Sequence, residues 1–172
     1  VLAAALGAIT YFWIASQLPP AEELQARAFQ SFATSQILDR EGNLLWEILD
    51  PTGGRRTRVS LDQISPYLIE ATVATEDRFF YNNVGVDSIA IGGYYNVTEG
   101  EIVSGASTIT QQLARNLLLS PEERIEQSFT RKVREAVLAV EINRRYSKEQ
   151  ILDIYLNQIY YGNIAYGIEA AA

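Results

Sequence analysis

The side chains able to do chemistry in this chain are carboxylates, hydroxyls, amides and cations, because its 172 residues include neither histidine nor cysteine. The absence of both residue types excludes Ser-His and Cys-His nucleophiles, disulfides and zinc sites built from Cys and His. Any reaction on this chain must therefore use a carboxylate as base, and cations or N–H groups where negative charge grows.

Glu76-Asp77 is the first candidate pair, at the end of a helix that Ser65-Pro66 is predicted to start. A carboxylate at this place faces the negative end of the helix dipole and the neighbouring rings of Phe79 and Phe80. Such surroundings suit a general base. The alternative is an exposed acidic pair in a turn, which an isolated Glu-Asp usually is.

A second candidate is the junction Gly105-Ala106-Ser107-Thr108, which ends a loop and begins a helix predicted over 108–119. The free N–H groups of a helix N-terminus and its positive dipole end favour an anion. Thr108, Gln112 and Arg115 fall at i, i+4 and i+7 and so share one polar face of that helix.

The third candidate is Arg131-Lys132-Val133-Arg134-Glu135, in which Arg131 and Lys132 both share a helix face with Glu135. This pattern fits a surface ion-pair cluster, and it equally fits a diphosphate clamp with an embedded carboxylate. The residues alone leave both interpretations open.

Charge is distributed unevenly along the chain. The net charge of −7 argues against a general nucleic-acid binder, which would carry a basic footprint. Between Arg115 and Lys148, however, lie eight of the fourteen basic residues, against five acidic ones. This local excess indicates an anionic ligand bound at one place, or else a solvated helical face.

The first 21 residues carry no charge and begin with a run rich in Ala, Leu, Val and Ile. Residues 1–18 resemble a membrane-spanning helix whose start is missing, with Tyr11, Phe12 and Trp13 at the lipid boundary and Pro19-Pro20 after it. A signal peptide and a buried core helix are the alternatives. Because the chain lacks a starting methionine and ends in an apolar helical pattern, we expect it to be a piece of a longer protein.

Turn chemistry and helix signals divide the rest of the chain. A short charged helix is predicted over 21–30, followed by strands over 35–38, 44–49 and 57–59. The remainder is predicted to be helical, with an apolar helical stripe of Val133, Ala136, Val137 and Val140 and a capping box at Ser147 that opens a further helix over 151–160. We therefore expect a truncated transmembrane anchor over 1–20, a linker with a small β-segment over 21–62, and a main domain over 63–172.

The order of these segments closely resembles glycosyltransferase family 51, the peptidoglycan polymerases of class A penicillin-binding proteins and monofunctional transglycosylases. The family's first motif reads E-D-x-x-F-x-x-H-x-G, and residues 76–85 read E-D-R-F-F-Y-N-N-V-G. Residues 105–116 match the second motif, G-[GA]-S-T-[IL]-T-Q-Q-L-x-[KR]-N, throughout, and residues 131–135 match the third, R-K-x-x-E. Residues 147–157 match the fourth, S-K-x-x-I-L-x-x-Y-L-N.

The resemblance implies the N-terminal portion of such a protein: a mainly α, lysozyme-like glycosyltransferase domain with a small N-terminal β-segment and a transmembrane anchor helix. Glu76 would deprotonate the 4-hydroxyl of the acceptor sugar, which attacks C1 of the donor and displaces undecaprenyl diphosphate with inversion. Glu135 would be the second important carboxylate. Arg131 and Lys132 would bind the diphosphate, with Gln112 and Arg115 alongside, and the remaining substrate-binding candidates are Asp77, Ser107, Thr108 and Asn116.

The resemblance also implies the surroundings of the protein. Its substrates would be lipid II and the growing glycan strand, with membrane lipid around it and room for a C-terminal transpeptidase domain in the full-length protein. It would lie in a bacterial cytoplasmic membrane as a single-pass protein, with its catalytic domain on the extracytoplasmic side. A divalent cation, Mg or Mn, commonly assists the leaving group in the family; its ligands here are not assigned, and no organic cofactor is expected.

Three positions depart from the family pattern: Asn83 replaces histidine, Gly92-Gly93 interrupts a segment that usually forms a helix with an arginine, and Arg115 replaces the commoner lysine. Two alternatives to a polymerase remain. One is a catalytically impaired relative that binds lipid-linked precursor. The other is a lytic muramidase, which would not need Arg131-Lys132.

Overall fold

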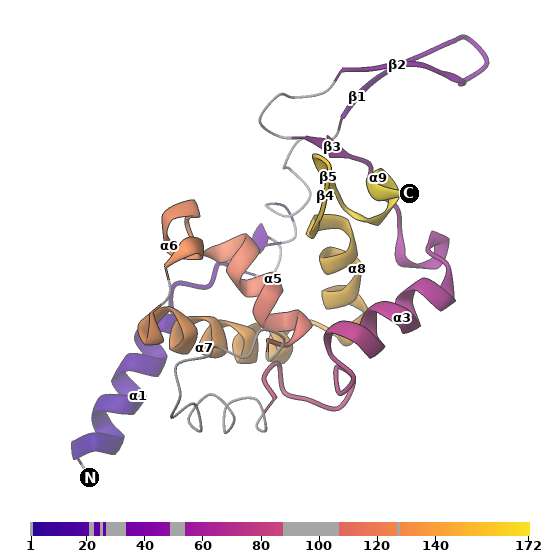
Figure 1. Cartoon of the computed structure of the whole chain (residues 1–172). Helices are drawn as coiled ribbons and strands as arrows, with labels where there is room; N and C mark the ends of the chain where they lie inside the picture. Colours follow the sequence, from indigo (N-terminus) through magenta and orange to yellow (C-terminus); the bar gives the residue numbers. More distant parts are fainter. Residues whose placement is uncertain are drawn as a thin grey trace.

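The computed structural model describes residues 2–20, 23–24, 26, 34–48, 54–87, 107–126 and 128–172. Helices predominate over short strands (Figure 1), which confirms the predicted mainly α class. The helices are α1 (Leu2–Ala15), α3 (Pro66–Glu76), α5 (Ile109–Leu118), α6 (Pro121–Ile125), α7 (Phe129–Arg145), α8 (Lys148–Gln158) and α9 (Ile168–Ala171), with a 3₁₀ turn η1 (Leu61–Gln63). The strands are β1 (Ser35–Leu38), β2 (Leu44–Ile48), β3 (Arg55–Arg56), β4 (Tyr160–Gly162) and β5 (Ala165–Tyr166).

The core lies where α5 packs against α7 and α8. Capping boxes start two of these helices, because Thr108 and Gln111 bond reciprocally at α5 and Ser147 and Gln150 do so at α8. The fully buried side chains include members of all three helices: Ile109, Leu113, Leu138, Ile142, Ile151, Leu152 and Leu156. The helix starts predicted from Ser65-Pro66, Thr108 and Ser147 are confirmed.

The apolar stripe predicted in α7 covers one of two faces of that helix that contact apolar groups. Val133, Ala136, Val137 and Val140 are only partly buried, whereas Leu138, Ala139 and Ile142 are buried together with Glu135. The fully buried face lies two positions, more than half a turn, from the predicted stripe, while Val133 and Val137 still pack against the core. A carboxylate occupies the buried face because two cations of the same helix neutralise it.

Two small sheets flank the helices. The predicted strands at 35–38 and 44–49 are present as β1 and β2, which pair as a hairpin. Strand β3 pairs in parallel with β5, and β5 pairs antiparallel with β4. The strand predicted over 57–59 is absent, because β3 covers Arg55–Arg56 instead. At Val59 the backbone bonds to the side chain of Asn157, through an N–H···Oδ1 bond of 3.0 Å and an Nδ2–H···O bond of 2.9 Å. The domain boundary at residue 62 stays a prediction.

The N-terminal helix α1 lies against α7. Ile14 and Leu18 are buried in the common core, and the Tyr11 hydroxyl donates to Glu141 Oε1 at 2.6 Å. Its other large apolar side chains, Leu6, Ile9, Phe12 and Trp13, are exposed. Of the helices that the structure describes, none has the length and hydropathy for a bilayer crossing. Most of the short helix predicted over 21–30 falls outside the described residues.

The loop after α3 lies close against α7 at Gly85. This residue has φ +98°, and a Cβ built on it would lie 2.4 Å from the carbonyl oxygen of Ala139. Two independent effects therefore disfavour any side chain at residue 85: the positive φ and the close approach of α7.

Gly85→Ala is expected to lower the free energy of unfolding by about 2 kcal/mol or more, combining the cost of a left-handed alanine with overpacking. The matched control is Gly42→Ala, which has φ +88° but no atom within 4 Å of its Cβ position. Chemical denaturation of both variants would measure the difference. Equal losses would show that the loop does not pack against α7 as described.

Candidate active site

Asp77, the residue after α3, lies over the N-terminus of α5. Its side chain is buried, and Oδ2 accepts the backbone N–H of Ile109 at 3.2 Å. The Asn83 amide donates to both carboxylate oxygens at 3.0 Å. Burial raises the pKa of the Asp77 carboxyl above its usual range, while the bonds from Asn83 and Ile109 act in the opposite direction. Asp77, predicted to bind substrate, thus joins the first and second motifs inside the protein.

Asn83, which stands where the family has histidine, connects the same loop to α8. Its Oδ1 accepts from the Gly85 N–H at 2.9 Å and from Lys148 Nζ at 3.1 Å, and its backbone oxygen accepts from Lys148 at 2.8 Å. Lys148 Nζ also lies 4.7 Å from the centre of the Phe80 ring. Asn83 therefore donates hydrogen bonds to Asp77 and accepts them from Lys148, and so holds the loop against the start of α8.

Thr108 completes this connection. Its hydroxyl donates to the backbone oxygen of Gly85 at 2.6 Å and accepts the N–H of Gln111 at 3.1 Å. The residue is buried, so its role in the described contacts is to cap α5 and fix the preceding motif. The neighbouring Gly105-Ala106 lies outside the described residues.

Glu76 lies at the last position of α3 with its side chain exposed toward a cavity of about 460 Å³. Gln112 of α5 donates from Nε2 to Glu76 Oε2 at 2.9 Å, and the Tyr155 hydroxyl of α8 donates to Gln112 Oε1 at 3.1 Å. Burial is the main cause that raises the pKa of the Tyr161 hydroxyl to about 12, and the negative charge of Glu76 raises it further. The cavity is lined by Ala71, Thr72, Thr75, Glu76, Gln112, Tyr155, Ile159, Tyr160 and Tyr161.

The third-motif residues form a charged cluster at the start of α7. Glu135 is fully buried and pairs with Arg131, and Lys132 Nζ lies 3.3 Å from its Oε2. Lys132 also donates to Ser107 Oγ at 2.5 Å. Both cations are oriented by the same buried carboxylate, which is the arrangement that the i, i+3 and i, i+4 spacing predicts.

Hydrogen bonds link this cluster to Glu76. Gln112 Nε2 donates to the Ser107 backbone oxygen at 3.4 Å as well as to Glu76, and the Ser107 hydroxyl accepts from Lys132. A continuous path therefore runs from the exposed carboxylate through one amide and one serine to the cations. The residues 131, 132 and 135 do not line the cavity at Glu76.

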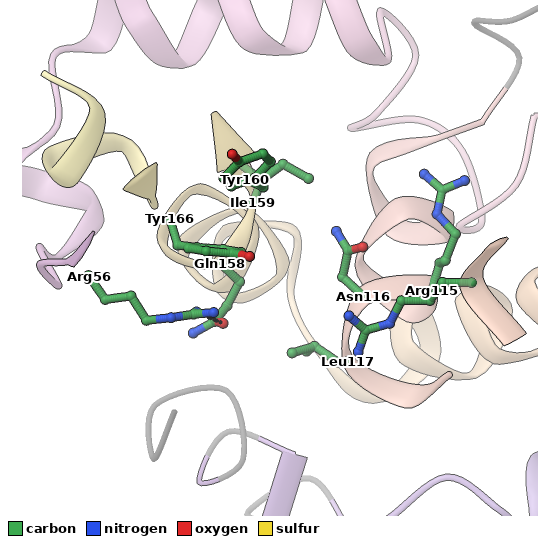
Figure 2. A pocket seen from close by; sticks show the side chains of 9 residues that line it. Arg56, Arg115, Asn116, Leu117, Gln158, Ile159, Tyr160 and Tyr166 are labelled. Atoms are coloured by element: carbon green, nitrogen blue, oxygen red, sulfur yellow. Dashed lines mark hydrogen bonds between the residues drawn. The ribbon is translucent and has the colours of Figure 1, made fainter. Parts of the chain in front are cut away.

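Arg115 and Asn116 lie in a second cavity, of about 440 Å³. Figure 2 shows them facing Arg56, Gln158 and Tyr166 across it. The Arg56 guanidinium stacks 4.0 Å from the Tyr166 ring centre and donates to Gln158 Oε1 at 3.0 Å. Among the described residues, the lining of this second cavity includes three arginines, Arg56, Arg115 and Arg124, and no carboxylate. The two cavities share Ile159 and Tyr160.

The structure thus brings together six of the predicted site residues and separates the others. Glu76, Gln112, Ser107, Lys132, Arg131 and Glu135 form the hydrogen-bonded path, Asp77 and Thr108 are buried beneath it, and Arg115 and Asn116 line the other cavity. Sequence reasoning missed Tyr155 and Tyr161, although the fourth motif and the segment after it contain them. It also missed Arg56, which no motif includes and only the β3–β5 pairing brings to the site.

The divalent cation expected from the family resemblance, Mg or Mn, stays a prediction. Among the described residues, no three acidic side chains lie close enough to share an ion. The Glu135 carboxylate is already paired with Arg131 and Lys132. The mechanism below therefore has no step through a metal.

Comparison with known proteins places this arrangement in one family. A helical domain in which a carboxylate on a polar cavity is linked by hydrogen bonds to a cluster of cations suits a carboxylate-dependent enzyme, without fixing its substrate. Residues 41–172 match the family model described as "Transglycosylase". The chain belongs to the transglycosylase family.

The curated relatives are penicillin-binding proteins. The chain is 46% identical to penicillin-binding protein 1A of Aquifex aeolicus over 80% of its length, and 42% identical to that of Escherichia coli over 94%. It is 40% identical to penicillin-binding protein 1A/1B of Bacillus subtilis over 100% of its length. In each case it spans 18% of the relative's length.

Asn83→Ala is expected to lower the free energy of unfolding by about 1–3 kcal/mol, because it removes both side-chain hydrogen bonds to the buried Asp77 carboxylate and one of the bonds from Lys148. The matched control is Asn43→Ala, which also removes an asparagine–aspartate bond (2.8 Å, to Asp39), but in an exposed turn. That change is expected to stay within about 0.5 kcal/mol. Urea denaturation compares the two, and a loss no greater than that of the control would refute the buried network.

Proposed function

We propose that this chain contains the glycosyl-transfer centre of a peptidoglycan glycosyltransferase. The reaction is the polymerisation of lipid II into β-1,4-linked glycan strands with release of undecaprenyl diphosphate. The observation that carries the proposal is the exposed Glu76 carboxylate on a cavity, bonded to Gln112 and linked through Ser107 to Lys132. Membership of the transglycosylase family supports the same conclusion.

Glu76 is the proton acceptor in this mechanism. The acceptor sugar enters the cavity beside α3, and its 4-hydroxyl loses a proton to the carboxylate as its oxygen attacks C1 of the donor. The Gln112 N–H fixes the direction of the carboxylate, and the tyrosine rings of the cavity wall provide surfaces on which a sugar can pack. A base fixed within hydrogen-bond reach contributes through both proton transfer and orientation.

Arg131 and Lys132 stabilise the departing diphosphate. The bond between C1 and the phosphate oxygen breaks with its electron pair going to the leaving group, so negative charge grows on the diphosphate. Glu135 is buried beneath the two cations and orients them. Its catalytic role is thus exerted through Arg131 and Lys132. Gln112 and Ser107, which bond to each other and to the two halves of the site, complete this part.

The second cavity contributes further cations to the same substrates. Arg115 and Asn116 come from the second motif, and Arg56 joins them from β3. Because two lipid-linked substrates meet in the reaction, more than one anionic group has to be bound at once. The three arginines around this cavity suit such a group.

The membrane anchor over residues 1–20 is part of the proposal. The exposed apolar side chains of α1, with no charge in the segment, support contact with lipid. We place the catalytic domain on the extracytoplasmic side of a bacterial cytoplasmic membrane, where the substrate's isoprenoid tail stays in the bilayer. A transpeptidase domain in the full-length protein is proposed from the penicillin-binding relatives.

One alternative is a catalytically impaired relative, which Asn83 in place of histidine had suggested. The hydrogen bonds of Asn83 to Asp77 and Lys148 hold its loop in place and weaken that argument. The departure at residues 92–93 lies outside the described residues. The other alternative is a lytic muramidase, whose reaction releases no diphosphate and so would not need the cations of Arg131 and Lys132.

Glu76→Gln is expected to abolish polymer formation, because an amide of the same size cannot accept the proton. The measurement is gel analysis of glycan made from labelled lipid II by the detergent-solubilised protein, with a rate loss of roughly 100-fold or more. Polymerisation at the wild-type rate by Glu76→Gln would sink the assignment. Binding of lipid II without product by the wild type would instead favour the impaired relative, and cleavage of preformed glycan the muramidase.

A comparison variant separates the two halves of the site. Arg131→Ala, verified as folded by circular dichroism, should bind lipid II more weakly, whereas Glu76→Gln should bind it normally. Unchanged affinity in Arg131→Ala would remove the diphosphate assignment and leave that of the base intact.

A further inference from the structure

The amide of Gln112 has three partners from three parts of the chain. Nε2 donates to Glu76 at the end of α3 and to the Ser107 backbone oxygen before α5, while Oε1 accepts from the Tyr155 hydroxyl of α8. The first two bonds are 2.9 and 3.4 Å and the third is 3.1 Å. Gln112 itself is only half-buried, so the surrounding packing alone does not fix its amide group.

A glutamine amide needs such fixing because its terminal torsion has a broad, shallow preference. Its two ends are also nearly identical in size but opposite in polarity. If Oε1 of Gln112 were turned toward Glu76, an acceptor oxygen would face two other acceptors, the Glu76 carboxylate and the Ser107 carbonyl. With Nε2 turned toward Glu76, both neighbours receive a hydrogen.

Tyr155 is the rigid partner of the three. It is 3% exposed and lies in the hydrophobic core between α5 and α8, so its ring cannot follow a moving amide. Burial raises the pKa of its hydroxyl well above the usual range, and the Glu76 charge adds to this effect. The hydroxyl therefore keeps its proton and remains able to donate to Gln112.

We propose that Tyr155 is a positioning residue for the proton acceptor. By fixing the carbonyl end of Gln112, it directs the amide N–H onto Glu76 and so aims that carboxylate into the cavity. The inference rests on the proposed function, and it adds a residue from the fourth motif that acts on the base only through Gln112.

A double-mutant cycle on the full chain tests this relay. Polymerisation of lipid II is measured over a range of substrate concentrations, to give kcat and KM, for the wild type, Tyr155→Phe, Gln112→Ala and the double variant. Tyr155→Phe removes one oxygen from a buried ring, and we expect kcat to fall roughly 10- to 100-fold with KM nearly unchanged. Because Tyr155 acts through Gln112, the double variant should be no slower than Gln112→Ala alone.

Tyr146→Phe is the control for the loss of a buried tyrosine hydroxyl away from both cavities. Tyr146 is 7% exposed at the end of α7, and its variant should retain the wild-type kcat. Thermal melting of all variants verifies that each is folded at the assay temperature.

The outcomes separate this inference from the proposed function. An active wild type in which the two losses multiply, or in which Tyr155→Phe keeps full kcat, overturns the positioning role alone. A wild type that makes no polymer overturns the proposed function and the positioning role with it.

Discussion

The carboxylate of Asp77 is the constraint on which the rest of the site depends. A buried charge is costly unless hydrogen bonds and opposite charge compensate it. Here the compensation comes from the N-terminus of α5, through Ile109, from the amide of Asn83, and from the nearby charge of Lys148. Because these groups come from three segments, satisfying one carboxylate fixes the end of α3, the start of α5 and the start of α8 relative to one another.

Glu76 is placed by that same interaction. It is adjacent in sequence to Asp77 but points to the surface, so the buried neighbour fixes its backbone while its own carboxylate stays available. Gln112 lies almost one turn into α5 beyond Ile109, which brings its amide to 2.9 Å from Glu76. The two consecutive acidic residues therefore have different surroundings: Asp77 bonds to the segments that form the site, whereas Glu76, the proposed proton acceptor, lies on the cavity.

Helix α7 provides the second support. Gly85 lets the loop approach its backbone closely, and Glu135 buries a carboxylate that orients Arg131 and Lys132. Lys132 then reaches Ser107, beside the N-terminal turn of α5. The cations are thereby placed by the packing of α5 against α7, so residues distant in sequence converge without a shared loop.

Local signals predicted the features that depend on neighbouring residues. The starts of α3, α5 and α8 follow from Ser65-Pro66, Thr108 and Ser147, and strands β1 and β2 follow from the turn chemistry between them. The pairing of Glu135 with Arg131 and Lys132 follows from helical spacing. These interactions lie within a few residues of each other, so composition and periodicity are enough to detect them.

Features that depend on tertiary packing were not predictable in the same way. The buried face of α7 includes Glu135, which a hydrophobic pattern would place outside. Asp77 and Thr108 match motif positions and so were expected to touch substrate, but only the fold shows that they bond to α5 and to Gly85. Arg56 reaches its cavity through strand pairing, and Tyr155 through the contact of α8 with α5.

The most direct test of this account is the polymerisation rate of Asp77→Asn, measured where circular dichroism shows the helices to be folded. The amide keeps one acceptor oxygen, which can still bond to Asn83 and Ile109, but its NH2 group would face the donating Asn83 amide in place of the second carboxylate oxygen. The substitution also removes the negative charge near Lys148, although the side chain keeps its size. The account predicts a rate at least roughly tenfold below wild type, because Glu76 and Gln112 lose their common support. A folded Asp77→Asn protein that polymerises lipid II at the wild-type rate would contradict it.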